Sequence, residues 1–348
     1  MKNLLALWTA TICTLPLLML SCKQQAGNSQ KGAEAATTPT IGKIERLSPE
    51  LDNLLPADAK IEALGEGYNW SEGPVWVARG GYLLFSDVPE NKIFKWKEGE
   101  GVSLYLTPSG FTGKKTESGE PGSNGLALDA EGRLVLCQHG DRRVARMTSP
   151  VDQPKPEFET LADRWNGKRF NSPNDVCFDR KGNLYFTDPP YGLPKHADDP
   201  TKEIPFQGVY RRTPDGSVDL LVDSLTRPNG IALSPDEKTL YVANSDPEKA
   251  LWMAYDLQAD GKLTNGRIFY DATPMVGEEY KGLPDGLKVS KAGIVFATGP
   301  GGVWIFKPDG TALGRINPGV PTANCALDSD EKVLYLTADM YLCRVKLW

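Results

Sequence analysis

Residues 227–245, RPNGIALSPDEKTLYVANS, contain the pattern that decides the fold. Two runs in which every second residue is apolar, IAL and LYV, flank the segment SPDEK. This segment has the Pro and Asp that tight turns favour, so the stretch predicts two antiparallel strands joined by a turn. Asn229-Gly230 stands directly before the first of these strands.

The same unit recurs five more times along the chain, with an oxygen-bearing side chain at the position of Asn229. The residues at this position are Glu72, Asn124, Asn174, Asn229, Asp285 and Asn324. Strand-rich repeats of roughly 40–50 residues are typical of propeller blades. The sequence therefore predicts an all-β fold, a six-bladed β-propeller, in which residues 61–64 are available to close the ring against the last blade.

The N-terminal segment resembles a bacterial lipoprotein signal peptide. Lys2 precedes an apolar run that ends just before Cys22, and a polar stretch follows. We expect residues 1–22 to be the signal peptide, 23–45 a disordered tether and 46–348 the propeller. The protein is then lipid-anchored through Cys22 on the periplasmic side of the bacterial envelope. An uncleaved membrane anchor is the alternative, although the apolar run is short for a span.

Composition points to an ordinary soluble domain. The chain has 348 residues, 24% of them charged, and a net charge of −6, which argues against a nucleic-acid partner. We expect a monomer. The cysteines beyond the signal peptide lie in strand-like runs without metal-binding spacing, so we expect free thiols, with a Cys325–Cys343 bridge as the alternative.

The six recurring positions predict a ring, because the innermost strand of every propeller blade faces the central channel. Two carboxylates with several amide oxygens suit a hard divalent cation. We expect one such cation, Ca²⁺ first, with Mg²⁺, Mn²⁺ or Zn²⁺ as alternatives, although the ring lacks the His and Cys that zinc favours. The competing interpretation is that Asn-Gly and Asp-Gly only form turns, which does not account for Glu72.

Four segments depart from the repeat, at residues 111–122, 160–172, 188–206 and 275–283. Long loops on one face of a propeller usually shape a pocket. His139, at the end of an inner strand, is a candidate proton shuttle or substrate contact, or else a structural histidine bonded to a neighbouring blade. The chain has no G-x-S-x-G motif, which argues against a covalent serine mechanism.

Four short motifs resemble those of the gluconolactonase/regucalcin (senescence-marker-protein) family. They are SEGPVW at 71–76, SPNDV at 172–176, RPNG at 227–230 and PDG at 284–286. FNSPND at 170–175 and TDPPYG at 187–192 resemble its bacterial gluconolactonase branch. The resemblance covers about residue 60 to the C-terminus and implies a six-bladed propeller with one divalent cation, usually Ca²⁺, in the channel.

The resemblance also implies residue roles. The metal ligands implied are Glu72, Asn229 and Asp285, with Asn174 beside the metal or bound to it. The implied reaction is hydrolysis of a sugar-acid lactone by water, for which Asp285 is the first candidate base and Asp188 the second. The candidate substrate contacts are Asn174, Asn124, His139 and Arg169.

One position departs from the family pattern. Regucalcin-like members have a sugar-binding Arg two residues before the Asn that corresponds to Asn174, whereas this chain has Ser172 there and Arg169 upstream. Two other functions stay open, because propellers host many activities. They are a non-catalytic ligand-binding lipoprotein and a hydrolase of another ester, a phosphoester or a glycoside.

Overall fold

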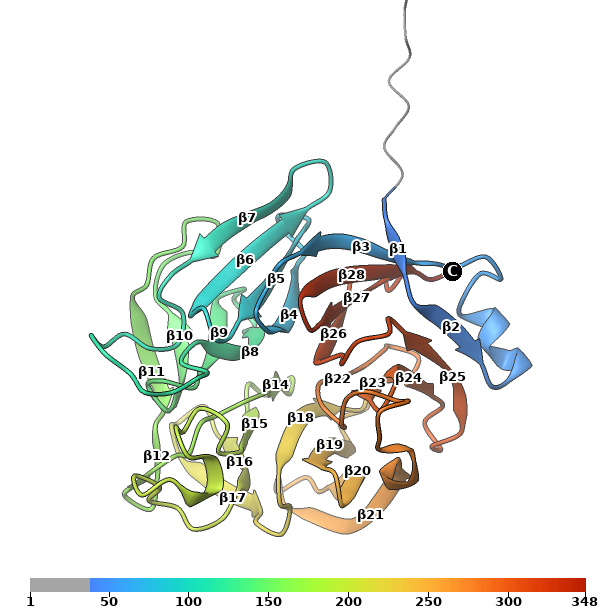
Figure 1. Ribbon diagram of the computed structural model, residues 1–348. Helices are drawn as coiled ribbons and strands as arrows, with labels where there is room; N and C mark the ends of the chain where they lie inside the picture. Colours follow the sequence, from blue (N-terminus) through green and yellow to red (C-terminus); the bar gives the residue numbers. More distant parts are fainter. Residues whose placement is uncertain (1–37) are drawn as a thin grey trace, which may run out of the picture. The chain divides into compact units, whose positions relative to one another are not determined.

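The computed structural model describes residues 38–348, whose regular secondary structure is almost entirely β-strand (Figure 1). Within this range the helices are three short 3-10 turns, and none is long or apolar enough to cross a membrane. They are η1 (Pro49–Asn53), η2 (His196–Asp198) and η3 (Thr273–Met275). The predicted signal peptide, the lipid site at Cys22 and the tether up to residue 37 lie outside the described residues.

Six antiparallel sheets form the blades, so the predicted six-bladed propeller is confirmed. Each of the first four blades has four strands that follow one another in the sequence. Blade 1 contains β4 (Ser71–Val77), β5 (Tyr82–Asp87), β6 (Lys92–Lys97) and β7 (Gly101–Leu106), and blade 2 contains β8 (Ser123–Leu128), β9 (Leu134–Gln138), β10 (Arg143–Met147) and β11 (Phe158–Ala162). Blade 3 contains β14 (Val176–Phe178), β15 (Leu184–Asp188), β16 (Gly208–Arg212) and β17 (Val218–Val222). Blade 4 contains β18 (Pro228–Leu233), β19 (Thr239–Asp246), β20 (Lys249–Leu257) and β21 (Leu263–Asp271).

The last two blades each take strands from the N-terminal part of the chain. Blade 5 contains β22 (Leu287–Val289), β23 (Val295–Gly299), β24 (Gly302–Phe306), β25 (Ala312–Asn317) and, on its outer edge, β2 (Lys43–Arg46); blade 6 contains β26 (Asn324–Leu327), β27 (Val333–Ala338), β28 (Tyr341–Lys346), β3 (Ile61–Glu66) and β1 (Thr40–Ile41). A separate two-stranded hairpin, β12 (Arg164–Trp165) and β13 (Lys168–Arg169), precedes blade 3.

Strand β3 closes the ring, as predicted from residues 61–64. It pairs with β28, with Ala63 opposite Cys343 and Glu62 opposite Arg344 (Figure 1). The pairing joins the two ends of the propeller and covers an otherwise free sheet edge. An ion pair of 2.6 Å between Arg344 Nε and Glu62 Oε2 lies across this junction.

The predicted tether extends too far into the fold. We expected it to reach residue 45, but β1 and β2 occupy residues 40–41 and 43–46. The Arg315 side chain pairs with Glu45, and β2 lies along β25 with Lys43 opposite Asn317. Small polar residues suggested a tether, whereas the free outer edge of blade 5 gives this segment a partner.

The core lies between the blades. The buried apolar residues form six clusters, and each cluster joins two neighbouring blades. On β5, Leu83 and Phe85 face blade 6 while Leu84 faces blade 2. Both faces of such a strand are therefore buried, which explains its continuous apolar sequence.

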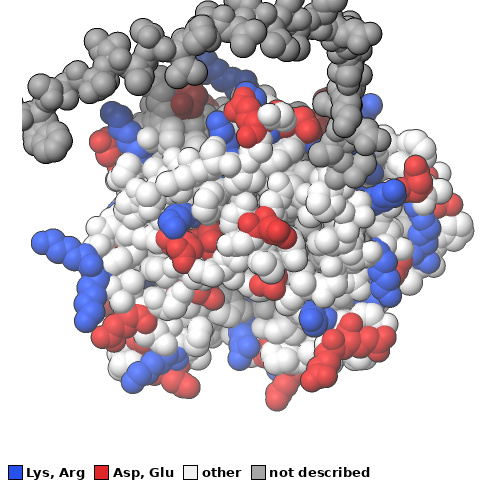
Figure 2. All heavy atoms as spheres, turned by 45° about the horizontal axis from the view of Figure 1, so that its top comes forward, with Lys and Arg blue, Asp and Glu red and all other residues white. Residues whose placement is uncertain are grey.

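The cysteines of the described residues are free, and Cys137, Cys325 and Cys343 are fully buried. The alternative Cys325–Cys343 bridge is absent: both thiols are free and belong to the apolar cluster between blades 5 and 6. Figure 2 shows acidic and basic side chains interspersed on the face in view.

Candidate active site

Five of the six recurring positions line one cavity of about 160 Å³, where the innermost strands begin. These residues are Glu72, Asn124, Asn174, Asn229 and Asp285. The sixth, Asn324, lies behind the cavity wall and donates from Nδ2 to Glu72 Oε2 at 3.1 Å. The predicted ring therefore becomes a five-residue lining with one supporting residue.

A glycine follows four of the six ring residues and lets neighbouring blades approach closely. A Cβ on Gly73 would lie 2.0 Å from the carbonyl oxygen of Asn124, and one on Gly230 would lie 2.2 Å from that of Asp285. The ladder register shifts just after the ring residue in β4, β8 and β18. Glycine recurs here because the next blade's backbone leaves no room for a side chain, rather than to form a turn.

Hydroxyl groups on the second strands hold the backbone of the ring residues. Ser86 Oγ donates to the carbonyl of Asn124 at 2.9 Å, and Thr187 Oγ1 donates to that of Asn229 at 2.6 Å. Both hydroxyls are buried, and each hydrogen bond satisfies a donor and an acceptor that water cannot reach. The ring side chains therefore project into the cavity from a fixed backbone.

Two carboxylates, Glu72 and Asp285, share the cavity. Glu72 is only 1% exposed; burial raises its pKa to about 7, and the Asp175 carboxylate adds to the effect. Burial and then the Glu72 charge raise the pKa of Asp285 well above its usual range. Two carboxylates that disfavour each other's ionisation favour a bound positive charge between them.

Two side-chain oxygens of the cavity that lack hydrogen-bond partners also favour a bound positive charge. Asp285 Oδ1 and Asn124 Oδ1 are inaccessible and have no hydrogen-bond partner among the described residues. Residues 38–348 contain no group of three His, Cys, Asp or Glu side chains placed to hold a metal ion. Beside the Glu72 and Asp285 carboxylates the cavity lining has amide oxygens, and this combination fits a hard divalent cation that binds oxygen.

Asn174 links Asn229 to His139. Its Nδ2 donates to Asn229 Oδ1 at 2.6 Å, and its Oδ1 lies 3.1 Å from His139 Nε2. His139 is fully buried, and burial lowers its pKa to about 4, so its imidazole is neutral. The imidazole therefore supports Asn174 from behind and is not part of the cavity lining.

Glu120 lines the cavity and was missed by the sequence analysis. It lies in the loop 111–122, and its Oε2 is 3.6 Å from His139 Nδ1. Burial raises its pKa to about 7. The only signal in the sequence is an acidic residue four positions before Asn124, in a loop already expected to shape a pocket.

Two further predicted site residues, besides His139, lie outside the cavity lining. The Asp188 carboxylate accepts the backbone N–H groups of Asn171 and Ser172, both at 2.8 Å. Arg169 donates from Nη2 to the Asp141 carbonyl at 3.2 Å. Asp188 therefore anchors the loop before Asn174, and Arg169 braces a neighbouring turn.

The long insertions do shape the cavity, as expected, through Tyr191 and Leu283. Ser172 fastens the first of them: its Oγ donates to the Pro189 carbonyl at 2.6 Å and accepts from Gly192 N at 2.9 Å. The residue that replaces the family's Arg is thus used to hold the insertion against the ring.

A partly buried positive charge lies beneath the ring. Lys288 Nζ is 3.8 Å from Asp175 Oδ2 and 3.2 Å from Asn324 Oδ1. Burial opposes the Lys288 charge, but the neighbouring acidic groups, Asp175 first and Glu72 among them, together outweigh it and the pKa of Lys288 is raised. Lys288 compensates Asp175, and the Glu72–Asp285 pair keeps its preference for an added cation.

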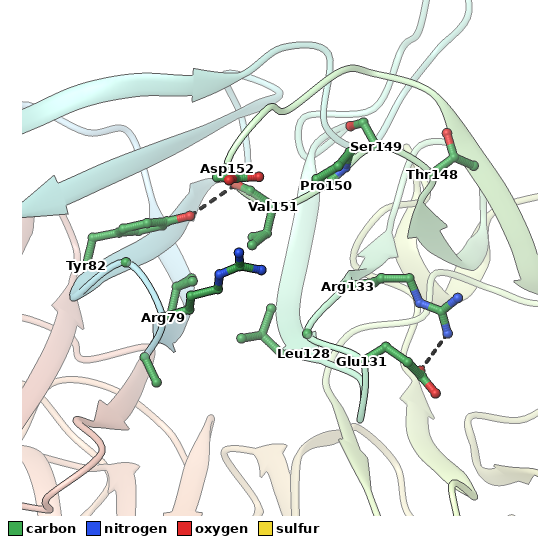
Figure 3. Close-up of a pocket in the computed structure, with 14 residues that line it drawn as sticks. Arg79, Tyr82, Leu128, Glu131, Arg133, Thr148, Ser149, Pro150, Val151 and Asp152 are labelled. Carbon is green, nitrogen blue, oxygen red and sulfur yellow. Dashed lines mark hydrogen bonds and ion pairs between the residues drawn. The ribbon is translucent and has the colours of Figure 1, made fainter.

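A larger cavity of about 620 Å³ lies at the other ends of the same strands (Figure 3). Val77 and Leu128, the last residues of β4 and β8, line it, and Tyr82 donates to the Val151 carbonyl at its edge at 3.0 Å. Its lining includes none of the six recurring residues, so size alone does not identify the site.

Known proteins resemble this chain over most of its length. It is 41% identical to a gluconolactonase of Zymomonas mobilis over 326 residues, which cover 92% of this chain and 90% of the relative. The structure of a gluconolactonase from Xanthomonas campestris matches with a TM-score of 0.76 at 33% identity, covering 89% of this chain and 97% of the other.

A more distant structure shares the fold. A regucalcin from Agrobacterium tumefaciens, described as a calcium-binding protein, matches with a TM-score of 0.62 at 18% identity, covering 82% of this chain and 93% of the other. Residues 70–339 match the model of the SMP-30/Gluconolactonase/LRE-like region. With the propeller and the ring in place, the chain belongs to the SMP-30/gluconolactonase family.

Proposed function

We propose that this protein is a lactonase that hydrolyses a sugar-acid lactone with the help of one divalent cation, Ca²⁺ first. The observation that carries this proposal is the burial of the Glu72 and Asp285 carboxylates in one cavity, beside amide oxygens. The similarity to gluconolactonases supports the substrate class. A cavity of about 160 Å³ suits a small ligand, since drug-sized ligands occupy roughly 300–1,000 Å³.

Glu72, Asp285 and Asn229 are the residues that would hold the cation. Asn229 Oδ1 accepts one hydrogen bond, from Asn174, and retains a second lone pair for a ligand. When bound, a cation in this position polarises a carbonyl and stabilises negative charge on its oxygen. Asn174 positions Asn229, because its own oxygen faces His139.

Asp285 is our candidate for the base. Its Oδ1 lacks a hydrogen-bond partner among the described residues, so it keeps a lone pair that would accept the proton of a water bound in the cavity. Around the cavity, Arg227, Tyr191 and Ser245 supply donors that suit a hydroxyl-rich ring. The same residues keep much of the cavity wall polar, so the substrate is bound through hydrogen bonds rather than apolar contact.

The test is acid release from δ-gluconolactone by the protein as purified, after chelation and after addition of Ca²⁺, Mg²⁺, Mn²⁺ or Zn²⁺. We expect chelation to abolish turnover and Ca²⁺ to restore it. Glu131→Gln, in the cavity at the opposite strand ends, is a matched control that keeps full activity. Full turnover after complete chelation contradicts cation dependence, and turnover only of phosphoesters or glycosides contradicts the lactonase.

We also propose that Cys22 carries a lipid that holds the propeller at the periplasmic side of the envelope. The support is the sequence pattern of Lys2, the apolar run and Cys22. In that location the protein acts only on lactones that are present in the periplasm.

A further inference from the structure

Glu120 lines the cavity but has no role in the lactone hydrolysis described above. It is the one acidic residue that a loop, rather than a strand start, contributes to the lining of the cavity. Its side chain is 34% exposed, and its carboxylate accepts no hydrogen bond from the described residues. A carboxyl group that is both reachable by water and free of partners is available for proton transfer.

His139 favours the protonated form of this carboxyl group. Since Asn174 Nδ2 donates to Asn229 Oδ1, Asn174 Oδ1 is left to accept from His139 Nε2. The neutral imidazole then carries its lone pair at Nδ1, beside the Glu120 backbone carbonyl and 3.6 Å from Glu120 Oε2. An acceptor beside a carboxyl group favours the form that carries a proton.

We propose that Glu120 is the general acid that protonates the ring oxygen of the lactone as its bond to the carbonyl carbon breaks. This inference rests on the proposed function and assigns a second catalytic group within the same cavity. Asp285 and Glu120 then have opposite tasks: one accepts a proton from water and the other donates one to the leaving group.

The reaction balances with these two groups. A bond forms between the water oxygen and the carbonyl carbon, and the bond from that carbon to the ring oxygen breaks. Asp285 takes one proton from the water, while Glu120 gives one to the ring oxygen, which becomes a hydroxyl. Asp285 then releases its proton and Glu120 regains one from solvent through its exposed part, so the enzyme is restored without any other reactant.

Other groups around the cavity are compatible with this assignment. The carboxylates of Asp285 and Glu72 lie on the same lining and have the separate task of holding the cation. Arg227 and Tyr191 also line the cavity, but no ion pair joins Arg227 to Glu120 among the described residues. Burial raises the Glu120 pKa to about 7, which is near the ideal value for an acid at neutral pH.

The experiment compares two kinds of leaving group in the isosteric variant Glu120→Gln. An alkyl lactone such as δ-gluconolactone needs its ring oxygen protonated, whereas an aryl lactone such as dihydrocoumarin releases a stable phenolate. We expect kcat/KM for the alkyl lactone to fall about 100-fold or more, and that for the aryl lactone to change less than about threefold. Glu117→Gln, an exposed residue of the same loop, is the control and keeps both rates.

Calcium titration and circular dichroism establish that the variant is folded and binds cation like the wild type. Equal losses on both lactones, or a loss below about tenfold on the alkyl lactone, overturn the assignment. A wild-type protein that hydrolyses no lactone instead contradicts the proposed function itself. The wild type offers a measurement that needs no variant: across alkyl, aryl and thiolactones its kcat/KM changes little with leaving-group pKa, and a steep dependence overturns the inference.

Discussion

Asn324 Nδ2 donates a 3.1 Å hydrogen bond to Glu72 Oε2, so the first strand of the last blade holds the carboxylate at the start of the first blade. This bond spans the closure of the ring, and Glu72 Oε2 also accepts from Gly73 N at 2.6 Å. The position of one of the two carboxylates proposed to bind the cation therefore depends on how the two ends of the propeller meet.

We expect Asn324→Ala to weaken both the fold and cation binding. The change removes a buried donor from Glu72 and an acceptor 3.2 Å from Lys288 Nζ, which costs about 1–3 kcal/mol of unfolding free energy. Urea unfolding and calcium titration measure the two effects. Gln258→Ala, an exposed carboxamide, is the control. Unchanged calcium affinity in a destabilised Asn324→Ala protein would show that the bond is structural only.

Asp285→Ala and Asn174→Ala are expected to separate cation binding from turnover. Asp285→Ala removes a charged ligand together with the proposed base, so both the bound calcium and the lactonase rate should be lost. Asn174→Ala removes the group that positions Asn229, so more calcium should remain bound while the rate falls. Calcium per chain and δ-gluconolactone turnover are measured for both. An Asp285→Ala protein with full calcium and full rate contradicts the site.

The sequence predicted the blades and the ring residues because both repeat. Blade number follows from the recurrence of one strand–turn–strand unit, and the five lining residues share one place in it. Glu120 and Lys288 have no such signal, since the first lies in a loop and the second in a short apolar strand. Asp188 was misplaced because a strand-end carboxylate serves equally to anchor a loop, and only its two backbone partners distinguish the roles.

Two truncations test how the ring closes. A protein that begins at residue 48 loses β1 and β2 but keeps four strands in every blade, so it should fold with a modestly lowered Tm. A protein that begins at residue 68 also loses β3, exposes the edge of β28 and removes buried Ile61, so it should aggregate or unfold. Thermal unfolding and size-exclusion chromatography distinguish them. Equal stability of the two would mean that β3 does not close the ring.

Replacement of Cys22 tests the proposed anchor. Cys22→Ser should prevent lipid attachment, so that the protein is released from the membrane fraction or its processing stops. Cys13→Ser, within the apolar run, is the matched control and should leave fractionation unchanged. Cell fractionation with labelled fatty acid provides the measurement. Wild-type protein found in the cytoplasm with Met1 intact would rule the anchor out.

The pH dependence of the cation-free protein follows from Glu72. Its pKa in the folded protein is about 7, above its ordinary value of about 4.3 in an unfolded chain. The folded state therefore binds more protons between these values, and the stability that this contributes is present at low pH and is lost as the pH rises toward about 7. Urea unfolding in chelator should show falling stability from about pH 5 to about pH 8.

Calcium affinity should change in the opposite direction over the same range, because a cation binds the ionised carboxylates. We expect the affinity to rise by about tenfold per pH unit for each proton displaced and to level off above about pH 7. Glu72→Gln should flatten the stability profile, since its carboxamide does not titrate, while Glu131→Gln should leave the profile unchanged. If the cation-free protein instead becomes more stable as the pH rises from 5 to 7, Glu72 is ionised without a cation and the two carboxylates do not form the proposed pair.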